Sequence, residues 1–382
     1  MKIVLVVDYF GETTNGTTVT TKLLHNALIR HGHEVKILAG VGNGWKNVYE
    51  TGYLKIPVLY YFCSKNGFLM AKTNKKVFKE ALDGADLVHF LADFPMDRAA
   101  KRYCDKHGIL TSSAFHIQPE NATAQVHLNC KFINSLVFLY YRVKFYSKFS
   151  DIHVPSQMIA NQLRKHHYKA DIHVISNGID TKFKPVDSPR PPEFNNKYLI
   201  TMVGRISREK RQDLVIKAVS KSKYAKKIQL ILLGNGTWLN KIRKLSKKYL
   251  VNQAKILFVK QDELIKILNY CDLYVHASDF ESEAISCMEA FACGLVPVIS
   301  DSKYSATSQF ALTSNNTFKK GDYKDLANKI DYWIEHQEEK EELSKKYIEY
   351  AKEYSTEKCG DKMNELFVKI VEKANGKDKS SN

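Results

Sequence analysis

Residues 273–300, LYVHASDFESEAISCMEAFACGLVPVIS, decide the fold. Two apolar runs, Leu273–Ala277 and Leu295–Ile299, flank the middle of this segment. Between them, Glu281 and Glu289 stand eight positions apart. The order of these features predicts a strand, a short loop, a helix and a second strand. One carboxylate would then lie at the carboxyl end of a parallel strand, the edge at which open α/β sheets bind ligands, and the other on the helix that follows. Such a pair is suited to hydrogen bonding with the hydroxyl groups of a hexose and a ribose.

A simpler interpretation makes Glu281 a solvated loop acid and Glu289 a helix surface acid. The neighbours of Glu289 argue against it, because this residue lies inside the apolar run Cys287–Phe291. A carboxylate buried in such a run needs a partner. We therefore interpret both acids as candidate site residues.

Strand-like apolar runs recur along the chain, at 3–7, 35–38, 87–90, 109–112, 198–203, 229–233 and 255–259. Helical segments separate them, such as the periodic stretch 18–31. This alternation predicts α/β architecture with two Rossmann-like doubly wound domains facing across a cleft.

The Pro- and Asn-rich stretch after Lys184 is the best candidate for an interdomain linker. We expect an N-terminal Rossmann-like domain at 1–183, a linker at 184–197, a C-terminal Rossmann-like domain at 198–350, a helix at 351–373 that packs back on the N-terminal domain, and a disordered tail at 374–382.

Composition places the chain among globular proteins. It has 382 residues, of which 44% are hydrophobic and 26% charged, and no apolar run is long enough to cross a bilayer. The strand-like run at 3–7 leaves no room for a signal peptide. Seven cysteines without CxxC spacing indicate reduced thiols and exclude a disulfide frame or a zinc site. These features predict a cytoplasmic protein.

The formal net charge of +17 calls for a polyanionic partner. Nucleic acid, an anionic membrane surface and a phosphorylated substrate all satisfy that requirement. No segment carries the signature of a nucleic-acid-binding module, so we expect no nucleic acid partner.

A basic turn follows the run 198–203. It reads Gly204-Arg205-Ile206-Ser207-Arg208-Glu209-Lys210. Glycine permits a sharp turn, the next helix points its amide dipole back at it, and Arg205 and Lys210 add full charges. The turn predicts a pyrophosphate site, with a basic surface loop as the alternative. Gly234 ends the next strand in the same way and could flank a nucleotide base.

Two segments of the N-terminal half also follow predicted strands. Gly11–Thr18 is a glycine-rich turn, a pattern that every doubly wound domain contains. His116 follows a later strand and has Gln118 and Glu120 close by. A lone histidine is often structural, but this position points into the expected cleft, so a structural and a functional role both stay open.

With these motifs the chain resembles the family-4 retaining glycosyltransferases of the GT-B fold over nearly all of residues 2–370. The resemblance rests on Val203–Lys210, on Glu281 and Glu289 at their spacing, on Glu289–Ile299, and on Ile175–Asp180 and Gly32–Val35.

The resemblance implies sugar transfer from a nucleotide-sugar with retention of configuration, without metal or other cofactor. By this analogy Arg205 and Lys210 would hold the donor diphosphate and Glu289 the ribose. Glu281 would contact the hexose as a catalytic residue, and His116 would lie near the reacting carbon. The leaving phosphate would take the acceptor proton. The other substrate-binding positions implied by the resemblance are Gly16, Gly204, Gly234, Glu283, Ala284 and Ile285.

One part of the motif departs from the family. Members often follow the first glutamate with Gly-aromatic-Gly, whereas this chain has Ser282-Glu283-Ala284. The extra acid leaves open whether Glu281 or Glu283 contacts the hexose.

The segment Leu69–Leu82 places four lysines on one predicted helical stripe: Lys72, Lys75, Lys76 and Lys79. The segment Tyr53–Phe62 upstream is rich in aromatic residues. A basic amphipathic helix beside aromatic residues predicts contact with an anionic membrane surface, with an ordinary solvated helix as the alternative. Residues 121–150 are apolar on all sides of a helical wheel, which a buried helix would explain equally well.

The runs 115–121 and 281–287 are most similar to the branch that glycosylates diacylglycerol-type lipids. This similarity predicts transfer from UDP-glucose or UDP-galactose to a membrane lipid, with the enzyme held peripherally on the inner face of the membrane. Transfer to a polysaccharide or cell-wall intermediate is the alternative, followed by a nucleotide-sugar epimerase and a non-catalytic sugar-nucleotide binder. The oligomeric state stays open.

Overall fold

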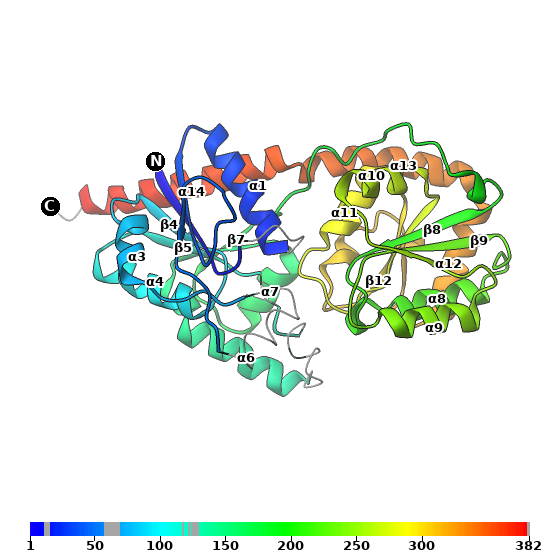
Figure 1. Cartoon of the computed structure of the whole chain (residues 1–382), viewed down its shortest axis with the longest axis horizontal. Helices are drawn as coiled ribbons and strands as arrows, with labels where there is room; N and C mark the ends of the chain where they lie inside the picture. Colours follow the sequence, from blue (N-terminus) through cyan, green and yellow to red (C-terminus); the bar gives the residue numbers. More distant parts are fainter. Residues whose placement is uncertain (11–15, 57–68, 117, 121–122, 124–129, 380–382) are drawn as a thin grey trace. The chain divides into compact units, whose positions relative to one another are not determined.

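The structure is a computed structural model that describes residues 1–10, 16–56, 69–116, 118–120, 123 and 130–379. It divides into two compact units (Figure 1). The first comprises residues 1–119, 130–178 and 356–382, and the second comprises 120–129 and 179–355.

The first unit contains a seven-stranded parallel sheet in the order β3-β2-β1-β4-β5-β6-β7. Its strands are β1 (Lys2–Val7), β2 (Glu34–Ala39), β3 (Val48–Glu50), β4 (Leu87–Phe90), β5 (Thr111–Ala114), β6 (Asp151–Val154) and β7 (Asp171–Val174). In register, Ile3 pairs with Val35 on one side and Leu87 on the other. The strand order therefore reverses between β1 and β4, which makes the carboxyl ends of these two strands the topological switch point.

Helices cover both faces of this sheet: α1 (Gly16–Arg30) and α14 (Thr356–Lys379) on one, and α3 (Lys75–Leu82), α4 (Pro95–Lys106), α6 (Lys131–Lys144) and α7 (Gln157–Lys165) on the other. The side chains of β1 alternate between the two cores. Ile3 and Leu5 pack with α1 and α14, whereas Val4 and Val6 pack with α3 and α4. The period of two in a strand buried on both faces explains why β1 reads as a continuous apolar run.

Helix α14 returns to the first unit and lies against α1. A Cβ atom at Gly360 would stand 2.5 Å from the Cβ of Ala27, so the two helices meet where neither carries a larger side chain. His33 adds a contact of 2.6 Å from its Nε2 to Asn364 Oδ1. The helix continues to Lys379, beyond residue 373, at which we expected it to end.

The second unit contains a six-stranded parallel sheet in the order β10-β9-β8-β11-β12-β13. Its strands are β8 (Tyr198–Val203), β9 (Ile228–Leu233), β10 (Lys255–Leu257), β11 (Leu273–His276), β12 (Pro297–Asp301) and β13 (Thr317–Lys319). Here the order reverses between β8 and β11, so the loops after these two strands flank the second switch point.

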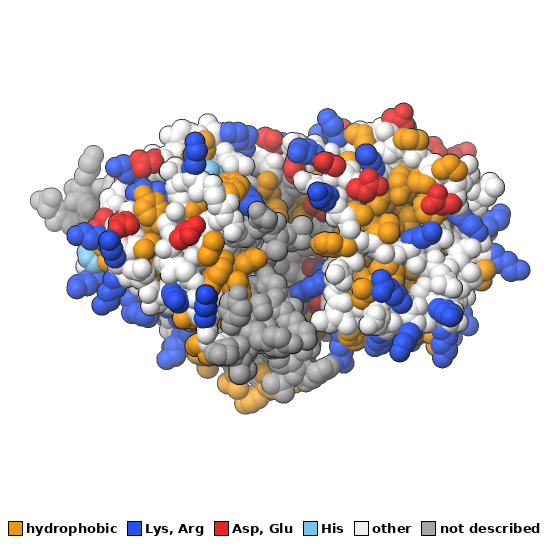
Figure 2. All heavy atoms as spheres, in the orientation of Figure 1, with side chains coloured by type: hydrophobic (Ala, Val, Ile, Leu, Met, Phe, Trp, Pro, Cys, Tyr) orange, Lys and Arg blue, Asp and Glu red, His pale blue; other side chains and the backbone are white. Residues whose placement is uncertain are grey.

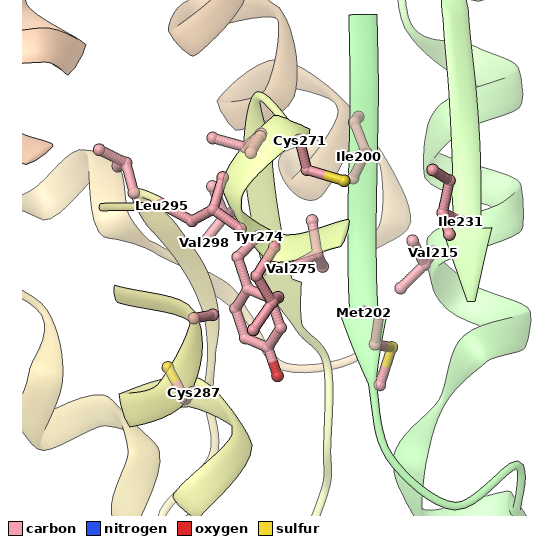
Figure 3. Packing of buried hydrophobic residues seen from close by; sticks show 14 of the residues in the cluster. Ile200, Met202, Val215, Ile231, Cys271, Tyr274, Val275, Cys287, Leu295 and Val298 are labelled. Atoms are coloured by element: carbon pink, nitrogen blue, oxygen red, sulfur yellow. The ribbon is translucent and has the colours of Figure 1, made fainter. Parts of the chain in front are cut away.

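The helices of the second unit are α8 (Gln212–Lys221), α9 (Leu239–Tyr249), α10 (Gln261–Tyr270), α11 (Ile285–Ala292), α12 (Tyr323–Glu335) and α13 (Gln337–Ala351). Helices α8 and α9 lie on one side of the sheet and α10, α11 and α13 on the other (Figure 1). Ile200, Met202 and Tyr274 belong to one buried cluster with residues of α8 and α11 (Figure 3). Short 3₁₀ turns complete the structure: η1 (Tyr146–Lys148), η2 (Pro192–Phe194), η3 (Arg208–Lys210), η4 (Ala306–Phe310), η5 (Ser314–Asn316) and η6 (Lys352–Tyr354).

One helix is shorter than the sequence pattern predicts. Helix α3 begins at Lys75, because the side chain of Asn74 caps it by accepting from the backbone N–H groups of Lys76 and Val77. Lys72 precedes this cap, so only three of the four lysines of the expected stripe lie on the helix.

Candidate active site

The switch point of the second sheet brings together two loops that are 71 residues apart in sequence, measured from Lys210 to Glu281. Lys210 ends the turn after β8, and Glu281 follows β11. The Nζ of Lys210 donates to Oε1 of Glu281, and the two side chains are 15% and 13% exposed. The expected phosphate-binding lysine and sugar-binding acid are therefore an ion pair in the structure.

His276 is a third member of this cluster, which the sequence analysis missed. Its Nε2 lies 3.1 Å from Oε1 of Glu281. Burial lowers the pKa of His276, so the ring is neutral, and Nε2 is the donor because a carboxylate only accepts. The signal in the sequence was a polar residue at the end of a buried strand.

The charge state of Glu281 follows from these partners. Burial by itself would raise the pKa of Glu281. The adjacent ammonium of Lys210 and the hydrogen bond from His276 outweigh burial and hold the pKa well below its usual range. Glu281 is therefore ionised at neutral pH. Both contacts use Oε1, so among the described residues Oε2 has no hydrogen-bond donor and can accept from a sugar hydroxyl.

Backbone contacts fix the position of Glu281. Its N–H donates to the carbonyl of Tyr304 at 3.2 Å, and its carbonyl accepts from the N–H of Ala306 at 2.9 Å. Behind His276, the hydroxyl of Tyr274 lies 3.2 Å from the ring Nδ1 and 3.2 Å from Ser286 Oγ. This acid is consequently held from both sides, as preorganised electrostatics requires.

Two glycines of the site lie backbone to backbone. Gly204 and Gly234 end the neighbouring strands β8 and β9, and the N–H of Gly204 donates to the carbonyl of Leu233 at 2.9 Å. A Cβ atom on Gly234 would stand 2.0 Å from the carbonyl oxygen of Gly204. Gly234 has φ +154°, a conformation that L side chains rarely adopt. The turn that follows β8 therefore requires glycine at position 234.

Arg205 of the turn has 47% of its side chain exposed, against 15% for Lys210. Its Nη2 lies 3.3 Å from Oε1 of the buried Glu209. The backbone carbonyl of Arg205 accepts from the side-chain amide of Gln212 at 2.9 Å. A fixed backbone and an exposed guanidinium leave this side chain able to meet an anionic ligand.

The helix after each loop begins at a non-glycine residue with positive φ. Arg211 has φ +59° before α8, and Ala284 has φ +73° before α11. Such a conformation strains a residue that carries a Cβ atom, and strained residues concentrate at functional sites. Ile285 is the first residue of α11, so the unpaired N–H groups of two helices lie next to the loops of the site.

Glu283 and Glu289, the other two acids of the motif, differ in accessibility. Glu283 is 3% exposed, less than Glu281. Glu289 lies on α11 and is partly buried. Burial, and then the nearby Asp180, raise the pKa of Glu289 to about 7. Its protonation is thus poised near neutral pH, in contrast to that of Glu281.

In the first unit, His116 follows β5, is partly buried, and lies beside the buried imidazole of His153. Its ring centroid lies 5.5 Å from that of His153. Burial lowers the pKa of His116 to about 3 and that of His153 to about 4, so both rings are neutral at physiological pH. Nε2 of His116 is buried without a hydrogen-bond partner among the described residues. The ring can therefore offer a neutral polar edge, and it is not a proton donor at pH 7.

Two acids at the first switch point were not predicted. Asp8 directly follows β1, and Asp97 lies in the first turn of α4. The two carboxyl groups interact electrostatically, and Asp8 Oδ2 accepts from the N–H of Ala71 at 2.7 Å. Burial raises the pKa of Asp8 to about 7, and burial together with Asp8 raises that of Asp97. A carboxylate at the end of the first apolar run was the available signal.

Other predicted residues are placed without a specific contact. Gly16 is the first residue of α1, and no described atom lies within 4 Å of a Cβ built on it. The preceding residues Gly11 to Asn15 lie outside the described residues, as do residues 57–62 of the aromatic segment.

The lysines of α3 point away from the domain. Lys75, Lys76 and Lys79 are exposed, whereas Phe78 and Leu82 on the same helix are buried in the first core. The apolar side of α3 is thus used for packing, and what α3 presents outward is charge.

Among the described residues, no group of His, Cys, Asp and Glu side chains is arranged to hold a metal ion, and no helix is long and apolar enough to cross a membrane. The six described cysteines are free thiols.

Comparison with protein families accounts for both halves of the chain. Residues 14–183 match the family described as Glycosyltransferase Family 4, and residues 183–354 match Glycosyl transferases group 1. An uncharacterised glycosyltransferase, MJ1069 of Methanocaldococcus jannaschii, is 31% identical over 199 residues, which are 48% of this chain and 50% of that protein. The chain thus matches about half the length of this relative.

Solved structures share the fold. Anabaena Alr3699/HepE, crystallised with UDP and glucose, has a TM-score of 0.73 at 16% identity, covering 97% of this chain and 100% of that one. At this identity the likeness shows the GT-B architecture of two doubly wound domains. The catalytic domain of cholesterol-alpha-glucosyltransferase from Helicobacter pylori is 46% identical but covers 41% of this chain and 99% of that one, with a TM-score of 0.40. A TM-score this low does not support an argument about the acceptor.

Proposed function

Because the chain belongs to the family-4 glycosyltransferases of the GT-B fold, we propose that it transfers a hexose from a nucleotide-sugar to a membrane lipid, with retention of configuration. UDP-glucose and UDP-galactose are the proposed donors. The observation that carries the proposal is the charged cluster of Lys210, Glu281 and His276 at the switch point of the second sheet.

The cluster suits a diphosphate leaving group. Lys210 provides a cation at the switch point, Arg205 provides a second cation with nearly half of its side chain exposed, and two helices begin at the same loops. Fixed charges aimed at developing negative charge typically lower a barrier by about 3 kcal/mol each. In the proposed mechanism these groups stabilise the leaving diphosphate without a metal ion.

Glu281 and Glu289 have different proposed roles in binding the donor. Glu281 is ionised, and its Oε2 has no donor among the described residues, which supports its proposed contact with a hexose hydroxyl. Glu289, with its pKa near 7, would accept from ribose hydroxyls once deprotonated. His116 is neutral and would offer hydrogen bonds near the reacting carbon without titrating. The leaving phosphate would then take the acceptor proton.

The test is sugar transfer to lipid vesicles from a panel of nucleotide-sugars, with both glycolipid and free nucleotide measured. We expect glycolipid from a UDP-hexose, and the anomeric configuration of the product, read by NMR, to match that of the donor. An inverted product would refute retention. Nucleotide release without glycolipid would point to a polysaccharide or cell-wall acceptor. Absence of turnover with every donor would contradict the enzyme proposal.

A further inference from the structure

Helix α6 of the first unit is apolar on two opposite faces. Its inner face is part of the core: Phe138 is buried, and its ring stacks on those of Phe115 at 6.1 Å and His166 at 4.1 Å. The carbonyl of Phe138 also accepts from the hydroxyl of Tyr168 at 2.9 Å. These contacts fix the rotation of α6 about its axis, and so they fix which side chains point outward.

The outer face carries five large apolar side chains. Their exposed fractions are 72% for Phe132, 48% for Leu136, 44% for Leu139, 47% for Tyr140 and 55% for Val143. Offsets of four, seven, eight and eleven residues from Phe132 place all five on one stripe of a helix, opposite Asn134 and Phe138. We call this stripe the α6 outer face. In Figure 2, hydrophobic side chains are exposed along the lower edge of the first unit, where Figure 1 places α6.

The exposed apolar residues of α6 are clustered and not distributed singly over the surface. Five of the fifteen exposed large hydrophobic residues among the described residues fall within these twelve positions of one helix. Isolated exposed apolar residues need no explanation, but a contiguous patch on a rigid helix marks a contact surface.

The charged residues on helix α6 and just beyond its end are basic. Helix α6 contains no acidic residue. Lys131 stands at its beginning, and Lys144 and Lys148 stand at its end and just beyond, all three exposed. Arg142 is used inside the domain, where Nη1 donates to the carbonyl of His166 at 2.8 Å. The three lysines therefore place positive charge at the two ends of the outer face.

These features favour one binding partner of the α6 outer face over the others. A second copy of the chain paired through α6 would set lysines against lysines, with no acid on the helix to neutralise them. With 14 residues, α6 is too short to span a bilayer. A helix with an apolar outer stripe and a cationic border is suited to lie in the plane of an anionic membrane surface, with its apolar side chains among the acyl chains.

Tyr140 is also held in place for such a contact. Its hydroxyl accepts from Nη1 of Arg98 at 2.6 Å, and the Arg98 guanidinium lies 4.9 Å from the ring centroid. Arg98 is in turn paired with Asp93 at 2.5 Å. A tyrosine ring anchored at the edge of an apolar stripe matches the amphipathic layer of a membrane interface.

We propose that the α6 outer face, framed by Lys131, Lys144 and Lys148, docks the protein in the plane of an anionic lipid bilayer. The inference deepens the proposed function, which places the acceptor in a membrane, but its test does not depend on catalysis. Helix α3, from which the sequence predicted membrane contact, contributes charge only, since its apolar side chains are buried in the core.

The test is co-flotation of the full chain with phosphatidylcholine vesicles, with and without phosphatidylglycerol. The variant F132S/L136S/V143S should bind anionic vesicles at least about tenfold more weakly than the native chain, because burial of the stripe is lost. The matched control V186S/V251S/L312S removes three exposed apolar side chains of the second unit and should bind as the native chain does. Equal binding by the α6 variant and the native chain would overturn the proposal.

The charge arm compares K131Q/K144Q/K148Q with K75Q/K76Q/K79Q, which removes the same number of lysines from α3. We expect the α6 set to lose more affinity for anionic vesicles, since its lysines flank the inserted stripe. An equal or larger loss from the α3 set would contradict docking through α6.

A spectroscopic arm reports insertion directly. In the variant F132W, the added indole should shift to shorter emission wavelength on anionic vesicles and be quenched by brominated acyl chains, relative to the native chain. No shift and no quenching would overturn the proposal.

Two further readouts separate this inference from its alternatives. A change from dimer to monomer in F132S/L136S/V143S, measured by analytical ultracentrifugation, would overturn membrane docking in favour of self-association. Hydrolysis of UDP-hexose in free solution should be equal in native and α6 variants. Vesicle binding without any transfer would refute the proposed function and leave the docking surface intact.

Discussion

At the switch point of the second sheet, the ions Lys210 and Glu281 face each other, whereas Asp8, Asp97 and His116 in the first unit have pKa values shifted toward their neutral forms. Lys210 and Glu281 form an ion pair in the second unit. In the first unit, Asp8 and Asp97 have raised pKa values and His116 has a lowered one. Both sheets are parallel and reverse their strand order in the same way.

The difference shows that topology locates a site and that loop residues decide its chemistry. The charged edge, where Lys210 and Glu281 lie at the switch point of the second sheet, is suited to the diphosphate of a nucleotide-sugar. The neutral edge of the first sheet, with Asp8, Asp97 and His116, is suited to a hydroxyl group on an otherwise apolar acceptor. Neutral side chains leave no unpaired charge beside such a molecule.

Removing the cation of the charged edge should have the largest effect. We expect Lys210→Ala to lower kcat by about 10²–10³-fold, because the leaving diphosphate loses a preorganised charge. Lys221→Ala, an exposed lysine at the end of α8, is the matched control and should retain native turnover. Steady-state kinetics with UDP-hexose measures both, and near-native kcat in Lys210→Ala would remove this residue from the mechanism.

Filling the space between the two glycine turns should be nearly as costly. Gly234→Ala places a Cβ atom 2.0 Å from the carbonyl oxygen of Gly204. We expect a loss of roughly 3 kcal/mol in the free energy of unfolding or an equivalent loss of nucleotide affinity. Gly321→Ala shares a positive φ of +78° but meets no atom within 4 Å, so it should cost about 1 kcal/mol. Similar costs in both variants would show that the close approach is not required.

The raised pKa of Asp8 should make the free energy of unfolding depend on pH. Asp8 has a folded pKa of about 7, above the ordinary aspartate value of 3.8, so the stability it contributes is full at low pH and is lost as pH rises through about 7. Between pH 7 and pH 5 the native chain should gain about 2 kcal/mol from this group. Asp8→Asn should lack that gain, whereas Asp262→Asn on the exposed start of α10 should keep it.

Denaturant unfolding of each variant at both pH values measures this gain. Acidification protonates the unfolded state at His116 and His153, whose folded pKa values are lowered, and so opposes the gain. Because both histidines are present in all three proteins, the difference between variants isolates Asp8. Parallel pH profiles for the native chain and Asp8→Asn would contradict the neutral pair.

Glu289 should make donor affinity depend on pH. Its pKa of about 7 implies that its carboxylate forms as pH rises from 6 to 8. UDP-glucose, whose phosphate groups do not titrate in this range, should bind up to roughly tenfold more tightly at the upper end. Glu289→Gln should flatten this dependence in calorimetric titrations. A steep dependence that persists in the variant would assign it to another group.

The smallest effect should come from the strained helix start. Ala284 has φ +73°, so Ala284→Gly should raise the free energy of unfolding by about 1 kcal/mol. Ala218→Gly, in the buried interior of α8, should lower it and serves as the opposite control. Thermal unfolding measures both. A loss of stability in Ala284→Gly would show that the neighbouring contacts need the methyl group.

Strands buried on both faces were predictable because they form continuous apolar runs. Leu87–Phe90 and Tyr198–Val203 have the predicted bounds. The short strands β3, β6, β7 and β13 were missed, since each has only three or four residues and includes polar side chains. Helix α3 was predicted too long because its amphipathic period continues upstream of the capping residue Asn74.

Site residues could be predicted where position and charge agreed in the sequence. Arg205, Lys210 and Glu281 follow predicted strands, and the structure places them around one switch point. His276 and Asp8 were missed, because the roles of both depend on partners that only the fold brings near, namely Glu281 and Asp97. The outward direction of the apolar side chains of α6 likewise depends on which of its faces packs against the sheet.

The most direct test of the charged edge is calorimetric titration of UDP-glucose and of uridine into the native chain and Lys210→Met. Methionine keeps the length and apolar stem of lysine and removes its charge. We expect the variant to bind UDP-glucose at least about tenfold more weakly while its affinity for uridine stays unchanged, because Lys210 acts on the diphosphate. Equal affinities of the two proteins for UDP-glucose, or a parallel loss with uridine, would contradict the assignment of this edge as the donor site.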